Sequence, residues 1–136
     1  MKRIWVNGSF DVLHVGHVRL LEYASSLGDI LYVGVDSDER IKKMKGNNRP
    51  FNTLEDRILM LESIKYINEV FSFNSNDELK YCLYILNIDI MVVGSDYKNK
   101  KVIGSELVNN VKFFNRLEKY STTNILNYEK NISNRR

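Results

Sequence analysis

Two histidines near the start of the chain, His14 and His17, have the residue type and spacing that phosphate chemistry needs. They are the only histidines of the sequence and lie three positions apart, so at the start of a helix both can face one ligand. Imidazolium groups stabilise charge that accumulates on phosphoryl oxygens, which is most of what a protein contributes to phosphoryl or nucleotidyl transfer. A lone histidine more often caps a helix or packs in a core. Here the pair shares one segment with Gly8, Asp11 and Gly16, and the combination favours catalysis.

The elements around this segment are expected to hold it as a turn between a strand and a helix. Residues 2–6 contain a short β-rich run. From residue 16 onward, apolar residues recur at helical spacing until Gly28, which supplies a stop. Such a junction points backbone N–H groups and the positive end of the helix dipole at one place. The sequence therefore predicts an anion site at this turn.

The rest of the chain alternates strands and helices. β-rich apolar runs predict further strands at residues 29–35, 69–73, 89–93 and 111–114. Caps and helical spacing predict helices at residues 38–45, 53–64, 77–86 and 103–108, and a last one from residue 121. This alternation predicts an α/β fold with a single Rossmann-like, doubly wound, mostly parallel five-stranded sheet that has helices on both faces.

Sheets of this kind bind ligands outside the carboxyl ends of their strands. Asp36 follows the second expected strand, and Gly94 to Tyr97 follow the fourth. The fifth strand leads to Arg116 and to the hydroxyl series Ser121, Thr122 and Thr123. At a helix start these hydroxyls would form a second phosphate site, although alone such a series is more often a simple cap. A triphosphate would need a second anion site beside the first.

Length and composition indicate one globular domain. The 136 residues are expected to form a domain at 1–126 and a polar tail at 127–136. A net charge of +3 is too small to indicate nucleic-acid binding, and a single cysteine excludes an internal disulfide. No apolar run approaches a membrane span, and the N-terminus leads into a strand rather than a signal sequence. A cytoplasmic protein without a membrane partner is expected.

The segment from Gly8 to His17 carries a family resemblance. It resembles the G-x-F-D-x-x-H-x-G-H signature of the cytidylyltransferase-like branch of the HxGH nucleotidyltransferases, in the same strand–turn–helix context. The resemblance implies transfer of a nucleoside monophosphate from a nucleoside triphosphate to a phosphorylated small molecule, with release of pyrophosphate.

A longer match, extending to about Leu126, narrows the resemblance. Residues 45–57, KGNNRPFNTLEDR, are similar to the K-G-x-x-R-P-x-N-x-x-E-x-R segment of the D-glycero-β-D-manno-heptose 1-phosphate adenylyltransferases. Glycerol-3-phosphate cytidylyltransferases share the first motif and the Ser-Thr-Thr start but lack this segment. Two features depart from the heptose pattern. Ser95 replaces a usual glycine, and Arg116 is placed like an arginine of the cytidylyltransferases. ATP with a heptose phosphate is favoured over CTP with glycerol 3-phosphate or a related alditol phosphate.

The resemblance implies a role for each matching position. The residues expected to stabilise and neutralise phosphates in catalysis are His14, His17, Lys45 and Arg57. Those expected to bind the nucleotide are Gly8, Ser9, Phe10, Gly16, Gly94, Asp96, Tyr97, Arg116, Ser121, Thr122 and Thr123. Those expected to bind the acceptor are Asp11, Asp36 and Lys45, with orientation of the histidines as a second possible role of Asp11. Arg57 lies in the first turn of an expected helix, where a cation opposes the dipole. This position indicates an external anionic partner or, equally, a surface charge without a function.

Cofactor and partner expectations follow. Mg²⁺ is expected, carried by the phosphates and water because no dedicated protein ligand set is evident. A homodimer and a place in lipopolysaccharide or other cell-surface polymer synthesis are implied by the resemblance alone. Two alternatives remain open: another nucleotidyltransferase of the same branch, acting on ethanolamine phosphate, pantetheine phosphate or FMN, and a regulatory module that binds nucleotides without turnover.

Overall fold

The computed structural model describes residues 1–115, in which five strands form one all-parallel sheet. The strand order is β3-β2-β1-β4-β5. The strands are β1 (Arg3–Gly8), β2 (Ile30–Asp36), β3 (Glu69–Phe73), β4 (Ile90–Gly94) and β5 (Asn110–Phe114). Residues 116–136, which contain the expected domain boundary, lie outside the described part.

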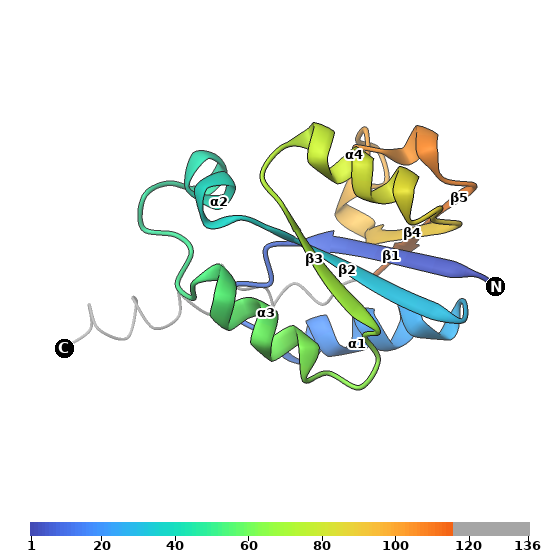
Figure 1. The fold of residues 1–136 in the computed structure, drawn as a ribbon, viewed down its shortest axis with the longest axis horizontal. Helices are drawn as coiled ribbons and strands as arrows, with labels where there is room; N and C mark the ends of the chain where they lie inside the picture. The colour runs from blue at the N-terminus through green and yellow to red at the C-terminus, as the bar shows by residue number, and fades with distance from the viewer. Residues whose placement is uncertain (116–136) are drawn as a thin grey trace.

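Helices connect the strands and cover both faces of the sheet (Figure 1). The α-helices are α1 (Val15–Ser26), α2 (Asp38–Lys45), α3 (Leu54–Glu62) and α4 (Asn76–Ile85). Two short 3₁₀ helices, η1 (Ser95–Tyr97) and η2 (Ser105–Leu107), follow β4. The predicted doubly wound α/β fold is confirmed.

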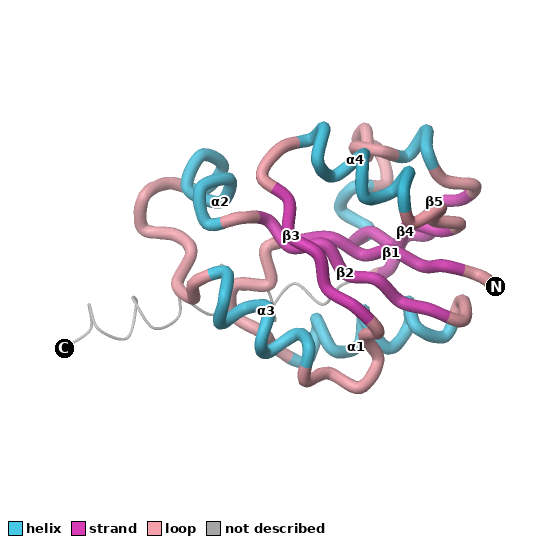
Figure 2. Tube along the Cα trace, in the orientation of Figure 1, coloured by secondary structure: helices cyan, strands magenta, loops and turns pink. Residues whose placement is uncertain are grey.

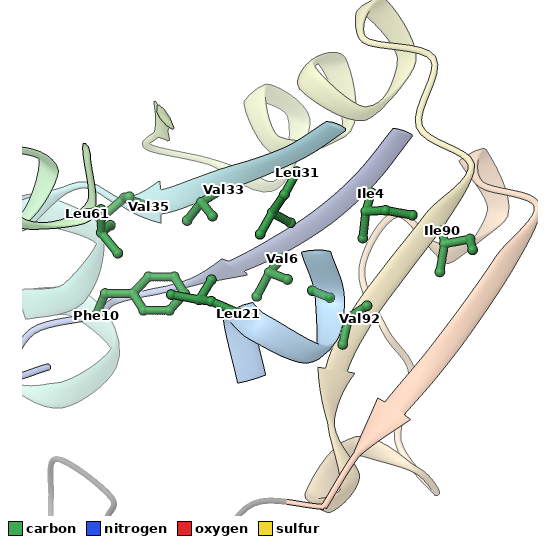
Figure 3. Packing of buried hydrophobic residues seen from close by; sticks show 11 residues of the cluster. Ile4, Val6, Phe10, Leu21, Leu31, Val33, Val35, Leu61, Ile90 and Val92 are labelled. Carbon is green, nitrogen blue, oxygen red and sulfur yellow. The ribbon is translucent and has the colours of Figure 1, made fainter. Parts of the chain in front are cut away.

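The alternation of side chains along β1 explains why both faces need a helical cover. Ile4 and Val6 belong to a core cluster shared with α1 and α3, as Figure 3 shows for Leu21 of α1 beside Val6. Trp5, between them, belongs to a second cluster with Leu79 and Leu83 of α4. Each face thus buries its own apolar set, which fixes the register of β1 between its neighbours.

The chain reverses its winding direction at β1. Strand β1 pairs with β2 on one side and with β4 on the other. In sheets of this topology the connections that follow the two strands at the reversal run to opposite faces, and ligands bind outside the carboxyl ends of those strands. The segment 9–14 lies at this point.

One expected helix differs from the structure. Residues 103–108 were predicted to be helical, but only the 3₁₀ helix η2 forms there. Gly104 has a φ of +87° and Val108 is extended, so an α-helix cannot include either residue. A Cβ at Gly104 would overlap Cδ1 of Leu83, so this glycine also lets the η2 segment approach α4 closely.

Gly34 of β2 makes possible the close packing of Trp5. An added Cβ would overlap Cζ2 of Trp5 and lie 2.7 Å from its Cη2. We expect Gly34→Ala to lower the free energy of unfolding by about 2 kcal/mol, because the buried indole has no room to move. Trp5→Phe removes these ring atoms. In a double-mutant cycle measured by urea denaturation, Gly34→Ala should therefore lower the free energy of unfolding much less in the Trp5→Phe variant than in the parent. Strictly additive effects would rule out the clash as the cause.

Candidate functional site

The two histidines close a reciprocal cap at the start of α1. His14 is the N-cap residue, and its Nδ1 accepts a hydrogen bond from the backbone N–H of Gly16 at 3.1 Å. The backbone N–H of His14 in turn donates to Nδ1 of His17 at 3.2 Å. The ring centroids lie 3.8 Å apart. The histidines thus perform with Nδ1 the role that serine and glutamate play in an ordinary capping box.

This cap determines which nitrogen of each ring carries the proton. Because Nδ1 accepts from a backbone N–H in both residues, the proton of each neutral ring lies on Nε2. A second proton on either ring would oppose that N–H, and two cations at a ring separation of 3.8 Å would repel each other. The geometry favours two neutral Nε2–H donors over the imidazolium pair expected from sequence.

The loop before the histidines is held by Phe10 and Asp11. Phe10 is buried, adopts a φ of +48°, and its ring centroid lies 5.5 Å from that of His17. A left-handed conformation is unusual for a bulky residue and persists only where the surroundings enforce it. Here the buried ring provides that constraint and turns the chain from β1 toward α1.

The Asp11 carboxylate is fully buried and bonded to the connection between α2 and α3. Its Oδ2 accepts from the backbone N–H of Phe51 at 2.8 Å and from Nε of Arg49 at 3.1 Å. Its Oδ1 accepts from the backbone N–H of Asn52 at 2.8 Å. The expected contact of Asp11 with an acceptor is not what this geometry favours, because protein donors already occupy both oxygens.

Arg57 is likewise buried and saturated with protein acceptors. Its Nε donates to the carbonyl of Asn52 at 3.0 Å, and its Nη1 donates to the carbonyls of Ser9 and Asp36 at 2.8 Å. Its Nη2 forms an ion pair with Asp38 at 2.7 Å. The sequence suggested an external anionic partner for this arginine. The structure instead provides an internal one, and the guanidinium ties the ends of β1 and β2 to α3.

Lys45 and Asp36 take different positions relative to the histidine loop. Nζ of Lys45, the last residue of α2, donates to Oγ of Ser9 at 3.2 Å, so this cation lies beside the loop as expected. The Asp36 carboxylate pairs with Nε of Arg40 at 2.8 Å and is nearly buried. Asp36 therefore supports α2 through Arg40, and its carboxylate faces a protein cation.

The other expected nucleotide contacts lie after β4 or outside the described residues. Gly94 ends β4, and Tyr97 in η1 is 48% exposed with Nζ of Lys100 5.7 Å from its ring centroid. The Asp96 side chain, Arg116 and the series Ser121, Thr122 and Thr123 are outside what the structure describes.

Asn52 is a site residue to which the sequence analysis gave no role. Its backbone N–H and its side-chain amide both bond Asp11, and its carbonyl accepts from Arg57. It therefore joins the two buried charges. Its inclusion in the segment 45–57 was the only sequence signal available.

The described residues contain neither a cluster of metal-ligating side chains nor a membrane-spanning helix. Among the residues that the structure describes, no group of three or more His, Cys, Asp or Glu side chains is arranged to hold a metal ion. The chain's own side chains in this part thus do not fit a metal cage. Within residues 1–115, no helix combines the length and apolarity needed to cross a membrane.

The buried Asp11 carboxylate predicts a specific dependence of stability on pH. Burial raises its pKa, but hydrogen bonds from Asn52 and Phe51 and the Arg49 guanidinium outweigh burial and hold the pKa below 3.8. Its stabilisation is therefore complete above about pH 4 and is lost as the pH falls through the lowered pKa. We expect Asp11→Asn to cost about 3 kcal/mol at pH 7 and to flatten the acid limb of the unfolding curve.

Asp29→Asn is the control for this measurement, because its exposed carboxylate accepts one backbone hydrogen bond. It should cost less than about 1 kcal/mol. The free energy of unfolding of both variants is measured by urea denaturation. An equal loss of this free energy at pH 7 in the two variants would contradict the role given to Asp11.

The sequence of this chain is similar to that of known proteins. A family model described as cytidylyltransferase-like matches residues 5–131. "Bifunctional protein HldE" of Campylobacter fetus is 43% identical over 124 residues, which make up 91% of this chain and 27% of that protein. The protein of the same name from Helicobacter hepaticus is 42% identical over 125 residues, 92% of this chain and 26% of that protein. The chain spans about a quarter of the length of these relatives.

A solved structure supports the same assignment. The lipopolysaccharide core biosynthesis protein from Thermoplasma volcanium is 25% identical, with a TM-score of 0.67 over 85% of this chain and 98% of that one. The family match includes β1, the histidine loop and α1, on which the candidate site is built. The chain therefore belongs to the cytidylyltransferase-like family of nucleotidyltransferases.

Proposed function

We propose that this chain transfers an adenylyl group from ATP to the phosphate of a heptose 1-phosphate and releases pyrophosphate. The observation that carries the proposal is the histidine cap. It places two Nε2–H donors at the positive end of α1, at the carboxyl end of β1. Preorganised donors of this kind stabilise charge that develops on phosphoryl oxygens.

The choice of ATP and a sugar phosphate has separate support. The segment 45–57 resembles that of the heptose 1-phosphate adenylyltransferases. It also supplies the contacts of Lys45 and Asn52 described above. The name of the Thermoplasma relative, a lipopolysaccharide core biosynthesis protein, favours a carbohydrate acceptor. The proposal concerns only the part that the chain shares with its longer relatives.

The reaction needs positioning and charge stabilisation more than proton transfer. An oxygen of the acceptor phosphate attacks the α-phosphorus, and the bond to the bridging oxygen breaks, so pyrophosphate leaves with the bonding electrons. The acceptor phosphate is already a nucleophile, so no side chain has to become one. Nε2–H of His14 and His17 donate to phosphate oxygens, and Lys45 neutralises charge beside Ser9.

The remaining residues bind or position the substrates. Gly8, Ser9, Phe10 and Gly16 shape the loop, and the residues assigned to the base and ribose are Gly94, Asp96 and Tyr97. On the resemblance alone, Ser121 and Thr122 are assigned to the β and γ phosphates, and Arg116 and Thr123 to nucleotide binding. Arg57 and Asp11 are assigned positioning roles, since their polar atoms bond the protein.

Metal and assembly belong to the same proposal. Nucleotidyltransferases of this family generally use a divalent metal, and Mg²⁺ is proposed as that ion, bound by the substrate phosphates and water. A homodimer in the cytoplasm is proposed from the resemblance.

Pyrophosphate release tests the proposed reaction. ATP and CTP, each with Mg²⁺, are combined with D-glycero-β-D-manno-heptose 1-phosphate and with glycerol 3-phosphate. We expect turnover only with ATP and the heptose. Turnover with CTP and glycerol 3-phosphate instead would assign the chain to the cytidylyltransferases and shift attention to Arg116. Nucleotide binding without turnover in any combination would indicate either a different phosphorylated acceptor or the regulatory module.

His14→Asn separates the catalytic role of His14 from its structural role. Asparagine is among the best N-cap residues and keeps the acceptor for the Gly16 N–H, but it lacks the Nε2–H donor. We expect the melting temperature to stay within about 3 °C, because the cap is retained. We expect kcat to fall about 10²- to 10³-fold, as for loss of one preorganised donor. A kcat within threefold of the parent would contradict the mechanism.

A further inference from the structure

Arg49 lies in the connection between α2 and α3 and is only partly satisfied by the protein. Its side chain is 15% exposed, and its Nε pairs with the buried Asp11 carboxylate at 3.1 Å. Its Nη2 is screened from solvent and makes no hydrogen bond to any described residue. A buried guanidinium N–H group without an acceptor is unfavourable, and such groups are rare in folded proteins.

Arg57, eight positions later on the same segment, does not share this state. Each nitrogen of the Arg57 guanidinium donates to a carbonyl or carboxylate. Both arginines lie on the same segment and both reach the histidine loop. The guanidinium nitrogens of Arg57 therefore all bond the protein, whereas Arg49 retains a buried donor to which residues 1–115 offer no acceptor.

The surroundings of Arg49 indicate an anion. Asp11, which orients the guanidinium, precedes His14 by three residues. Lys45 contacts Ser9, two residues before Asp11. Two cations from the α2–α3 segment thus touch one short loop, and a guanidinium suits the geometry of phosphate oxygens.

The topology indicates which phosphate this is. The α2–α3 segment follows β2, whereas Gly94 and Tyr97 follow β4, on the other side of β1. Figure 2 shows the α2–α3 connection as a loop beside α2, beyond the carboxyl ends of the strands. With the base and ribose assigned to Gly94 and Tyr97 on the β4 side, the β2 side, where Arg49 lies, is left for the phosphate of the acceptor.

We propose that Arg49, through Nη2, binds the phosphate of the acceptor substrate and, together with Lys45, selects a phosphorylated acceptor. The inference rests on the proposed nucleotidyl transfer. It adds a ligand for the acceptor in place of Asp11 and Asp36, whose carboxylates are paired with Arg49 and Arg40.

Arg49→Lys tests the inference, because lysine keeps the positive charge for Asp11 but removes the guanidinium fork. The triphosphate site of the full chain is first filled with an ATP analogue that has a methylene between the α and β phosphates. Inorganic phosphate is then titrated by calorimetry. We expect phosphate affinity to fall at least about tenfold, and affinity for the analogue to change less than about twofold.

Arg40→Lys is the matched control. Arg40 is also 15% exposed and paired with an aspartate, but its Nη2 already bonds Asn76. Its phosphate affinity should equal that of the parent. Unchanged phosphate affinity in Arg49→Lys, or an equal loss of phosphate and analogue binding, would overturn the inference.

A second measurement uses the unaltered chain and does not depend on the folding of any variant. The guanidinium resonances of Arg49 in a ¹⁵N spectrum should shift on addition of phosphate to the analogue complex, and those of Arg57 should stay in place. Absence of a shift at Arg49 would also overturn the inference.

Turnover of the heptose 1-phosphate by the parent separates this inference from the proposed function. If the parent does not turn over the heptose 1-phosphate but its phosphate affinity depends on Arg49, the proposed reaction is wrong and the role of Arg49 stands. With turnover and an unchanged KM for the heptose phosphate in Arg49→Lys, only the role of Arg49 is wrong.

Discussion

The candidate site depends on two buried charges that fasten the α2–α3 connection to the end of β1. Asp11 accepts the backbone N–H groups of this connection, and Arg57 donates to the carbonyls of Ser9 and Asp36. Both charges are removed from water, so each is tolerated only while its polar partners are in place. Asn52 bonds both and couples them. The loop that presents the histidines is therefore held by one network, and losing any member weakens the whole.

Patterns local in sequence made the fold and the strand–helix turn that carries the histidines predictable. Strand β3 and helix α2 form where apolar runs and caps predicted them, because burial and capping act over a few residues. The position of the histidines at a strand–helix turn followed from the same patterns. Gly28 shows a limit even here. Helix α1 ends just before Gly28, with Leu27 as its C-cap, as the sequence predicted. The structure gives this glycine a second role that the sequence did not show, because an added Cβ would lie 2.8 Å from Ile4 and from the Lys2 carbonyl oxygen.

The roles of the charged residues could not be read from these patterns. Asp11 and Asn52 are 41 positions apart, and Arg57 and Ser9 are 48 apart. Whether a carboxylate or a guanidinium meets protein or ligand depends on such distant pairings, and spacing along the chain contains no information about them. The sequence assigned Arg57 and Asp11 to a substrate site, and that role stays a prediction. It could not show that the protein itself satisfies them.

The protonation of the histidine cap determines where the positive charge of the site must come from. If His14 and His17 are neutral donors, they orient phosphate oxygens without attracting them strongly from a distance. The attraction then comes from the α1 dipole and from Lys45 and Arg49, which contact residues 9 and 11 of the same loop. Neutral donors gain strength as charge builds up on the phosphoryl oxygens, so they favour the transition state over the bound substrate. Fixed cations hold the acceptor dianion against the repulsion of the nucleotide. The cations thus serve mainly to bind the substrates, and the neutral histidines serve mainly to stabilise the transition state.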